Sequence, residues 1–391
     1  MEQPDRKKII SNLKRVVIKI GSSVISHREP GKAPLVQGLS QDMVRHYAAQ
    51  IKAMVDAGCE VVLVSSGAIM AGRERLGLVR NNLSIPEKQA CAAIGQSFLM
   101  HAYEKKFEKR GLKVAQILLS SDDLHNRRRY LNAKHTIEAL LKHSVIPIIN
   151  ENDSVTVDEI KIGDNDTLSA TVACLADAQL LIILSDVDGL YSRDPSVKSR
   201  KKNEDPPELI HQVNKVTPDV EKLAGKSNNL VTVGGMVTKV LAAKKTMSFG
   251  IPTLLVNGLD NKVLDKALKG ETVGTLFWPG KEKIRNRKHW IAHTLKPKGT
   301  IVVDAGAKKA LLDGRKSLLP AGVVRMEGNF EFGNSVCVVD ETSAEIARGL
   351  INYSNGDLEK IKGMKTSEVR KLFGSNYYEE VIHRDDMVVF Y

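Results

Sequence analysis

The first 280 residues alternate short apolar runs with longer segments whose apolar residues recur at helical spacing. Runs rich in β-branched residues predict strands at 16–20, 60–64, 114–119, 145–149, 180–184 and 251–256. Helical spacing predicts helices over 41–57, 90–110, 132–143 and 167–176, and another that opens at 233–239 and runs to about 249. This alternation indicates an α/β domain with an open, mainly parallel sheet sandwiched by helices.

The pattern changes towards the C-terminus. Short apolar runs at 301–303, 323–326 and 335–339 are separated by glycine turns, with little helix predicted between them. The segment 281–296 is dense in lysine and arginine and is predicted to be a basic linker. The expected organisation is therefore an α/β domain over 1–280, the linker, and a small β-rich domain with a C-terminal tail over 297–391.

The stretch 161–195 places two acidic turns beside one predicted helix and one predicted strand. The turn GDND at 163–166 ends in Asp166, a good N-cap for the helix that follows. The strand 180–184 runs directly into Ser185 and Asp186. Because ligands of open α/β sheets bind at the carboxyl ends of the strands, both turns lie where chemistry is expected.

Lys19 interrupts an otherwise apolar strand and is followed by the small-residue turn from Gly21 to Ser23. A lysine is unfavourable to bury, so one interpretation is an edge lysine that reaches solvent. The other is a cation aimed at phosphate, with the glycine turn offering backbone N–H groups. The strand–Lys–Gly pattern alone does not decide between them.

Polar residues at the predicted strand and helix ends favour phosphoryl transfer when they are taken together. Two lysines can neutralise phosphate oxygens, and paired carboxylates can hold magnesium or orient the lysines. Taken singly, each aspartate is better explained as a helix cap or a turn former. The collected residues are Lys19, Ser66, Asn150, Asp153, Asp164, Asn165, Asp166, Asp186 and Lys239.

Other catalytic patterns are absent from the sequence. It contains no G-x-S-x-G, no H-E-x-x-H and no G-x-x-x-x-G-K-[ST], which argues against a hydrolase elbow, a zincin and a P-loop. The four cysteines show no metal-ligand spacing, so no protein-bound metal is predicted and buried reduced thiols are expected.

Composition narrows the class of protein but not its function. The chain has 391 residues, 42% of them hydrophobic and 27% charged, which is typical of a soluble globular protein with more than one domain. A net charge of +12 suits anionic ligands, although only 5% of the residues are aromatic, which weakens a base-stacking surface. No apolar run approaches the ~20 residues of a membrane span, and the N-terminus lacks the apolar core of a secretory signal, so we expect no membrane association and a cytoplasmic location.

Five segments, in this order along the chain, closely resemble motifs of the glutamate 5-kinases, a group within the amino-acid-kinase family. The C-terminal region resembles the PUA domain that many of these enzymes carry, through LLPAGV at 318–323, GNF at 328–330 and HRDDM at 383–387. The five segments are VIKIGSSV at 17–24, SSGAIMAGR at 65–73, INENDSV at 149–155, KIGDNDTLSA at 161–170 and SDVDGLYSRDP at 185–195.

The resemblance implies the amino-acid-kinase fold and ATP-dependent phosphorylation of the γ-carboxylate of L-glutamate, the first step of proline biosynthesis. It also implies Mg²⁺ with ATP as co-substrate, feedback inhibition by proline, and a homo-oligomer, either a dimer or a tetramer. A separate glutamyl phosphate reductase is expected, because 391 residues leave no space for a fused one.

The resemblance also assigns roles to residues. It makes Lys19, Lys239 and Asp166 catalytic, and it makes Ser66, Asn150, Asp153, Asp164 and Asn165 substrate-binding. The nucleotide-binding residues that it implies are Lys19, Gly21, Ser22, Ser23, Ser185, Asp186, Gly234, Gly235, Met236 and Lys239. One departure concerns the loop G-T-G-G-M of the family, which here reads Thr232-Val233 before its two glycines, so that valine replaces a threonine hydroxyl.

Two alternatives remain open at the level of the sequence. A kinase of the same fold could phosphorylate a different small acid. The chain could instead act chiefly as an RNA-binding protein, because PUA domains elsewhere bind RNA and the net charge of this chain is positive.

Overall fold

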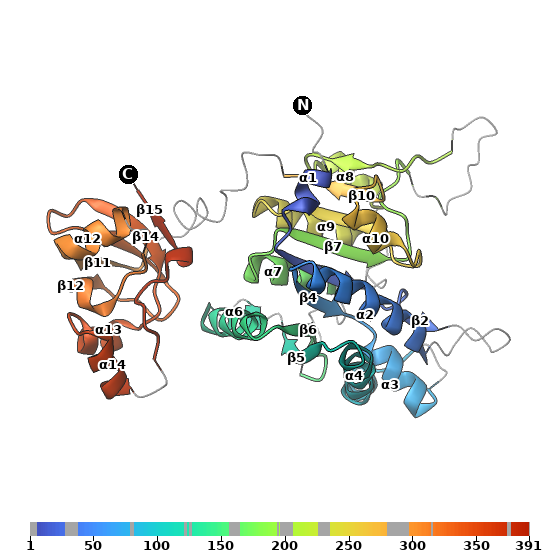
Figure 1. The fold of residues 1–391 in the computed structure, drawn as a ribbon, viewed down its shortest axis with the longest axis horizontal. Coiled ribbons are helices and arrows are strands. Elements are labelled where there is room, and N and C mark those ends of the chain that lie inside the picture. Colours follow the sequence, from blue (N-terminus) through green and yellow to red (C-terminus); the bar gives the residue numbers. More distant parts are fainter. Residues whose placement is uncertain are drawn as a thin grey trace. The chain divides into compact units, whose positions relative to one another are not determined.

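The computed structural model (Figure 1) describes residues 6–27, 38–78, 82–120, 123–124, 127–155, 165–193, 195, 206–225, 235–279, 297–313, 316–373 and 377–390. The chain forms two compact units, one of residues 1–125 and 132–284 and the other of residues 126–131 and 285–391. Among the helices in the described ranges, none has the length and apolarity needed to span a bilayer.

In the described part of the larger unit, eight strands form one sheet with the order β5-β6-β4-β1-β7-β9-β10-β8. Neighbouring strands are parallel except β9 and β10. The predicted open and mainly parallel sheet is confirmed. The strands are β1 (Arg15–Ile20), β4 (Glu60–Ser65), β5 (Lys113–Leu119), β6 (Val145–Glu151), β7 (Leu180–Ser185), β8 (Gln212–Val213), β9 (Thr253–Asn257) and β10 (Thr275–Phe277), with a separate hairpin of β2 (Ser26–His27) and β3 (Gly38–Leu39).

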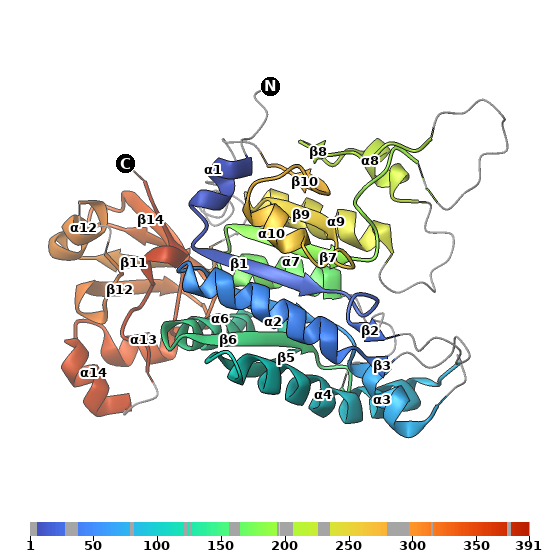
Figure 2. The same cartoon turned by 45° about the vertical axis from the view of Figure 1, so that its right-hand side comes forward.

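Helices such as α2 (Gln41–Asp56), α4 (Ile85–Glu108), α7 (Asn165–Leu175) and α9 (Met236–Ser248) pack against this sheet (Figure 2). The other helices described before residue 280 are α1 (Arg6–Ser11), α3 (Ala68–Leu76), α6 (Arg127–Lys142), α8 (Pro218–Leu223) and α10 (Val263–Leu268).

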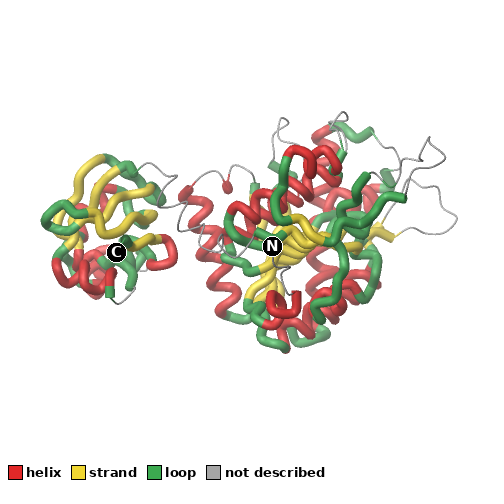
Figure 3. The backbone as a smooth tube through the Cα atoms, turned by 90° about the horizontal axis from the view of Figure 1, so that it is seen from above, coloured by secondary structure: helices red, strands yellow, loops and turns green. Residues whose placement is uncertain are grey.

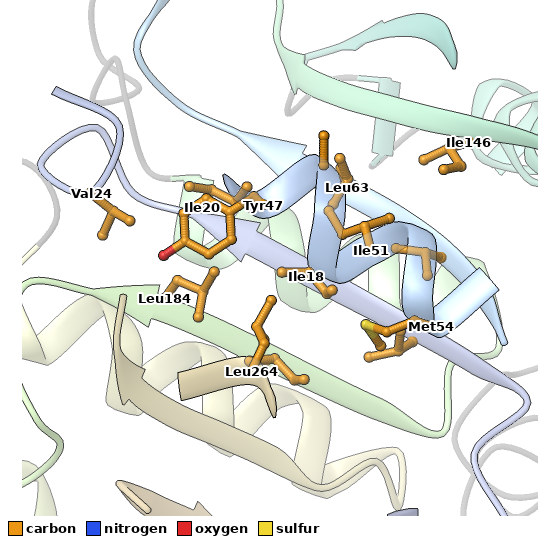
Figure 4. Packing of buried hydrophobic residues seen from close by; sticks show 14 of the residues in the cluster. Ile18, Ile20, Val24, Tyr47, Ile51, Met54, Leu63, Ile146, Leu184 and Leu264 are labelled. Carbon is orange, nitrogen blue, oxygen red and sulfur yellow. The ribbon is translucent and has the colours of Figure 1, made fainter. Parts of the chain in front are cut away.

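Successive side chains of β1 point to opposite faces of the sheet, one face towards the hydrophobic core and the other towards Asp166. Ile18 and Ile20 join a fully buried cluster with Tyr47 and Ile51 of α2 (Figure 4). Lys19 points the other way, to the face covered by α7. Because β1 is flanked by β4 and β7, Lys19 lies in a central strand and is only 6% exposed. The interpretation of an edge lysine that reaches solvent is therefore wrong.

Several helix boundaries differ from the prediction. Helix α3 lies where the sequence predicts no helix, because it begins after Gly67 in a left-handed conformation, with no side-chain cap to signal it. Helix α4 starts at Ile85 rather than 90, since Ser84 and Glu87 form a capping box. Helix α7 starts at Asn165, so Asp166 lies in its first turn and is not its N-cap.

The smaller unit has a five-stranded sheet in its described part, with the order β12-β11-β13-β14-β15. Figure 3 shows strands in yellow and helices in red in this unit, which carries the C-terminus. The prediction of little helix in this region is wrong, because short helices cover the sheet and supply core residues such as Leu311 and Leu358. The elements are β11 (Gly299–Val303), α12 (Ala305–Leu312), β12 (Val323–Gly328), β13 (Ser335–Val339), β14 (Glu345–Leu350), α13 (Asn355–Ile361), α14 (Thr366–Phe373) and β15 (Met387–Val389).

Two glycines let α3 and α4 approach each other unusually closely. A Cβ atom added to Gly95 would lie 1.8 Å from the carbonyl oxygen of Ala68, and one added to Gly72 would lie 1.8 Å from that of Cys91. Neither neighbour is a flexible side-chain tip that could move aside. The crossing of α3 and α4 therefore requires glycine at both positions.

Replacing Gly95 with alanine is expected to destabilise the larger unit by at least about 2 kcal/mol, because the two helices must separate to admit the methyl group. Chemical denaturation of the full chain measures this loss. Gly356→Ala in α13 is the matched control, since no atom lies within 4 Å of its added Cβ. That change should be neutral or stabilising by about 0.5–1 kcal/mol. Equal effects of the two substitutions would contradict the proposed steric cause.

Candidate active site

The candidate site lies at the carboxyl ends of four parallel strands. Strands β6, β4, β1 and β7 are consecutive neighbours in the sheet, so their ends share one edge. The N-terminal turns of α7 and α9 add residues to the same place, as the contacts below show. This is the edge where open α/β sheets bind ligands, because the loops there leave a crevice between the covering helices.

A buried carboxylate between two lysines forms the centre of the site. Lys19 Nζ lies 2.6 Å from Asp166 Oδ1, and Lys239 Nζ lies 3.2 Å from Asp166 Oδ2. The Asp166 side chain is fully buried and both lysine side chains are 7% exposed. Three residues separated by more than 70 positions from one another thus form one ion-paired cluster.

The electrostatics of Asp166 follow from its partners. Burial alone would raise the pKa of this carboxyl, but the positive charges of Lys19 and Lys239 outweigh burial and hold the pKa below its ordinary value of 3.8. Thr238 contributes as well, because its hydroxyl donates a 2.7 Å hydrogen bond to Asp166 Oδ2. Asp166 therefore stays ionised and holds the two ammonium groups close together.

Beside the ion cluster lies a group of linked amides. Asn165 Nδ2 donates to Ser66 Oγ at 2.8 Å and to Asn150 Oδ1 at 3.0 Å. Asn150 and Asn165 are both buried. Asn165 Oδ1 has no hydrogen-bond partner among the described residues. A buried acceptor without a partner is unfavourable, so this atom is suited to a donor supplied by a ligand.

Asp153 has the same character with a charge added. It is 8% exposed, and its Oδ1 lacks a hydrogen-bond partner in the described part of the chain. Burial raises the pKa of this carboxyl to about 6. A carboxylate that is uncompensated in this way can hold a cationic group of a ligand.

The predicted phosphate and nucleotide residues lie on the neighbouring turns. Gly21 follows β1, and a Cβ added there would lie 3.2 Å from the carbonyl oxygen of Leu184 on the adjacent strand. Ser185 ends β7 and is buried, and its hydroxyl donates to Asp186 at 3.2 Å. Gly235 is the N-cap of α9, and Met236 is the first residue of that helix.

Some predicted positions lie outside the described residues. These are Asp164 and Gly234, together with the Thr232-Val233 departure. Within the described ranges, no group of histidine, cysteine, aspartate and glutamate is arranged to hold a metal ion. Both oxygens of Asp166 are engaged by lysines, so this donor set does not fit a metal site built by the protein alone.

Two contacts escaped the sequence analysis. Thr238 bonds Asp166, and Gln96 of α4 accepts a 2.8 Å hydrogen bond from Asn150 Nδ2. A threonine directly before a functional lysine is a weak signal, and a glutamine in the middle of a helix gives none. Both roles depend on which elements pack together.

Comparisons with known proteins agree with this geometry. The family described as the amino acid kinase family matches residues 14–257, and the PUA domain matches residues 299–373. The chain is 50% identical over 384 residues to glutamate 5-kinase of Geobacter sulfurreducens, which covers 98% of this chain and 100% of that protein. It is 44% identical over 389 residues to glutamate 5-kinase of Moorella thermoacetica, with 100% of both chains covered. This chain belongs to the glutamate 5-kinases, within the amino acid kinase family.

A solved structure of UMP kinase from Bacillus anthracis is 18% identical, with a TM-score of 0.45 over 68% of this chain and 96% of that one.

Family membership confirms the expected resemblance, the kinase fold class and the PUA domain. Three of the predicted buried thiols, Cys59, Cys91 and Cys174, are buried. The roles of single site residues stay predictions.

Removing the charge of Asp153 is expected to stabilise the protein above neutral pH. Folding raises the pKa of this carboxyl from 3.8 to about 6, so its ionised form is less stable in the folded state than in the unfolded state. This penalty is fully present above about pH 6 and is mostly lost as the pH falls to about 4, because both states are protonated only below the ordinary pKa of 3.8. Asp153→Asn should therefore raise the free energy of unfolding by roughly 1–2 kcal/mol at pH 8.

Denaturation of the wild type and of Asp153→Asn at pH 8 and at about pH 4 checks this sign. The two proteins should differ at pH 8 and converge at the lower pH. A variant that is less stable than the wild type by the same amount at both pH values would show that the carboxylate is compensated.

Proposed function

We propose that this chain transfers the γ-phosphoryl group of ATP to the γ-carboxylate of L-glutamate, giving L-glutamyl 5-phosphate for proline biosynthesis. The observation that carries the proposal is the buried Lys19–Asp166–Lys239 cluster, together with an unpartnered carboxylate oxygen of Asp153 and an unpartnered amide oxygen of Asn165 among the described residues. Membership of the glutamate 5-kinases supports the same reaction.

The reaction brings two anions together, and the positive charges of the two lysines would reduce the repulsion between them. A carboxylate must approach the γ-phosphate of ATP, and negative charge spreads over the equatorial oxygens as the phosphoryl group moves. Lys19 and Lys239 would contact these oxygens from β1 and α9, whereas Asp166 fixes the positions of both ammonium groups. Charges held in place before the reaction lower the barrier, because no reorganisation is needed in the transition state.

The residues proposed to bind glutamate, called the acceptor pocket below because glutamate accepts the phosphoryl group, suit the ammonium end of this substrate. Asp153 and Asn165 Oδ1 would accept hydrogen bonds from the α-ammonium group, and Ser66 and Asn150 would line the same pocket. Asp164 is proposed there from the family motif. This placement leaves the γ-carboxylate towards Lys19 and Lys239, where the phosphoryl group is transferred.

The nucleotide would occupy the neighbouring turns. Gly21, Ser22 and Ser23 follow β1 and are suited to the phosphates. The donors would be the backbone N–H groups of Ser22 and Ser23, because the N–H of Gly21 donates to the carbonyl oxygen of Leu184 at 3.1 Å. Ser185 and Asp186 at the end of β7 would contact the rest of the nucleotide. On the side of α9, Gly234, Gly235 and Met236 would add contacts from the start of the helix, whose N-terminal dipole favours anions.

Magnesium would arrive with ATP, bound to the phosphate oxygens. Proline inhibition, a homo-oligomer, a separate glutamyl phosphate reductase, RNA binding by the PUA domain and a cytoplasmic location also stay predictions.

The lysine of α9 provides the first test. Hydroxylamine converts the acyl phosphate product to a hydroxamate, which can be measured with purified protein, Mg-ATP and glutamate. Lys239→Ala should lower kcat by roughly 10²–10³-fold, since one fixed charge on the transferring group is lost. Lys244→Ala on the same helix is the matched control, because that lysine pairs with Glu221 at the surface, and its kcat should be unchanged.

Three results would contradict the proposal in different ways. Full activity in Lys239→Ala would remove the lysine from the mechanism. Hydroxamate formed with acetylglutamate or aspartate but not with glutamate would keep the assignment as a kinase and show that glutamate is not the substrate. A wild type that phosphorylates none of these acids and binds RNA tightly, with a steep dependence on salt, would favour the RNA-binding alternative.

The pH dependence of glutamate binding tests the role of Asp153. The pKa of this carboxyl is about 6, so the ammonium group of glutamate loses its ionic partner as the pH falls below that value. The KM for glutamate should therefore rise below about pH 6, whereas the KM for ATP changes much less. In Asp153→Asn the KM for glutamate should be high and independent of pH over the same range, and a wild-type profile in that variant would exclude the assignment.

A further inference from the structure

Gln96 is a buried polar residue outside the set that the family motifs mark. It lies in the middle of α4 and is 9% exposed. Its Oε1 accepts a hydrogen bond of 2.8 Å from Asn150 Nδ2, and both residues are buried. Its Nε2 has no hydrogen-bond partner among the described residues.

One backbone group fixes the orientation of three linked amides. The N–H of Glu151 donates to Asn150 Oδ1 at 2.9 Å, so the Nδ2 of Asn150 must face Gln96. Gln96 must then present Oε1, because a rotated amide would place two donors against each other. On the other side, Asn165 Nδ2 donates to the same Asn150 Oδ1 at 3.0 Å, which leaves Asn165 Oδ1 as an open acceptor.

Helix α4, which carries Gln96, packs closely against α3 and against the ends of β4 and β6. Gly95, the preceding residue, sits at the close crossing where an added Cβ would lie 1.8 Å from the carbonyl oxygen of Ala68. Helix α3 begins at Ala68, two residues after Ser66. Tyr103, also on α4, shares a 2.8 Å hydrogen bond with Ser65 at the end of β4. Helix α4 therefore contacts the ends of both strands that line the acceptor pocket.

The two ends of the Gln96 amide differ in what they contact. An unpaired buried donor is unfavourable, so the Nε2 end does not explain a glutamine at this position. Here the Nε2 atom is left without a partner while Oε1 contacts Asn150. The contact that the Gln96 amide makes is thus through its oxygen, which accepts a hydrogen bond from Asn150.

We propose that Gln96 is a positioning residue for the acceptor substrate. By accepting from Asn150 Nδ2 it stabilises, together with the N–H of Glu151, one orientation of the Asn150 amide, and through that amide it favours an Asn165 that presents an oxygen, not an NH₂ group, to the ammonium group of the amino acid. The inference rests on the proposed function, since it concerns the pocket assigned above to glutamate. Gln96 itself need not touch the substrate.

Gln96→Met tests this, because methionine keeps the length and apolar volume of the side chain and removes the acceptor. The KM for glutamate should rise by roughly five- to a hundredfold, with kcat and the KM for ATP within about threefold of the wild type. Gln96→Glu keeps an acceptor towards Asn150 and should restore most of the affinity. Gln50→Met is the matched control, since Gln50 is a buried glutamine of α2 that bonds Asn261, and its KM values should not change.

Action through Asn150 is tested by a double-mutant cycle. In an Asn150→Ala background, Gln96→Met should have no further effect on the KM for glutamate. An equal rise in both backgrounds would mean that Gln96 acts directly on the substrate, and an unchanged KM in the single variant would mean that it does not act; either result overturns the proposal. If the methionine variant does not fold, Gln96→Asn, which is too short to reach Asn150, takes its place.

The same assay separates this proposal from the proposed function. A wild type that forms no glutamyl hydroxamate overturns both. An active wild type with unchanged KM for glutamate in Gln96→Met and Gln96→Asn overturns the role of Gln96 alone.

Discussion

The structure of the larger unit depends on the placement of one buried carboxylate between two buried ammonium groups. Asp166 is fully buried, and Lys19 and Lys239 are nearly so. An isolated charge at such a position would be strongly unfavourable, so each of the three is tolerated only while the others are in place. Loss of one partner from a buried pair of this kind typically costs about 3–5 kcal/mol. The cluster therefore links β1, α7 and α9 and couples the fold of the unit to its chemistry.

The same arrangement explains why the two sides of the site differ in character. On the side proposed for the nucleotide, the site offers positive charge and turns that end strands, which suit phosphate groups. On the side proposed for glutamate, it offers Asn165 Oδ1 and Asp153 Oδ1, two buried hydrogen-bond acceptors without partners in the described part of the chain. The unfavourable energy of these atoms in the unliganded protein is recovered when a ligand donates to them. Discrimination of an amino acid from a simple dicarboxylic acid can arise in this way, because an acid without the ammonium group leaves both atoms unpaired.

Close packing of the helices beside the residues proposed to bind glutamate depends on two glycines. Gly72 and Gly95 let the backbones of α3 and α4 touch, and α4 in turn reaches the ends of β4 and β6 through Tyr103 and Gln96. Amide side chains can rotate by half a turn with little change of shape, so their orientation must be fixed by neighbours. Here the backbone N–H of Glu151 orients the amide of Asn150, and the hydrogen bonds of Asn150 then favour one orientation of Asn165 and of Gln96.

Most of the long elements of the larger unit, the family, and the residue types of the site could be predicted from the sequence. The elements are β1, β4, β5, β6, β7, β9, α2, α4, α6, α7 and α9. Periodicity is a local property, so β1, β4, β6 and β7 could be located from their apolar runs, and Lys19 stood out because it interrupts one of them. Local signals failed where packing decides. Helix α3 lacks a side-chain cap, and the short helices of the smaller unit are stabilised by the sheet that they cover.

Which of these residues lie together depends on the tertiary structure. The sequence could not choose between an edge lysine and a buried cation for Lys19, because that choice depends on β1 lying between β4 and β7. It could not show that Thr238 and Gln96 support Asp166 and Asn150, since these contacts join elements far apart in the chain. Hydrogen bonds and ion pairs act over a few ångströms, whereas the residues that form them here are separated by tens of positions. The fold alone brings them within reach.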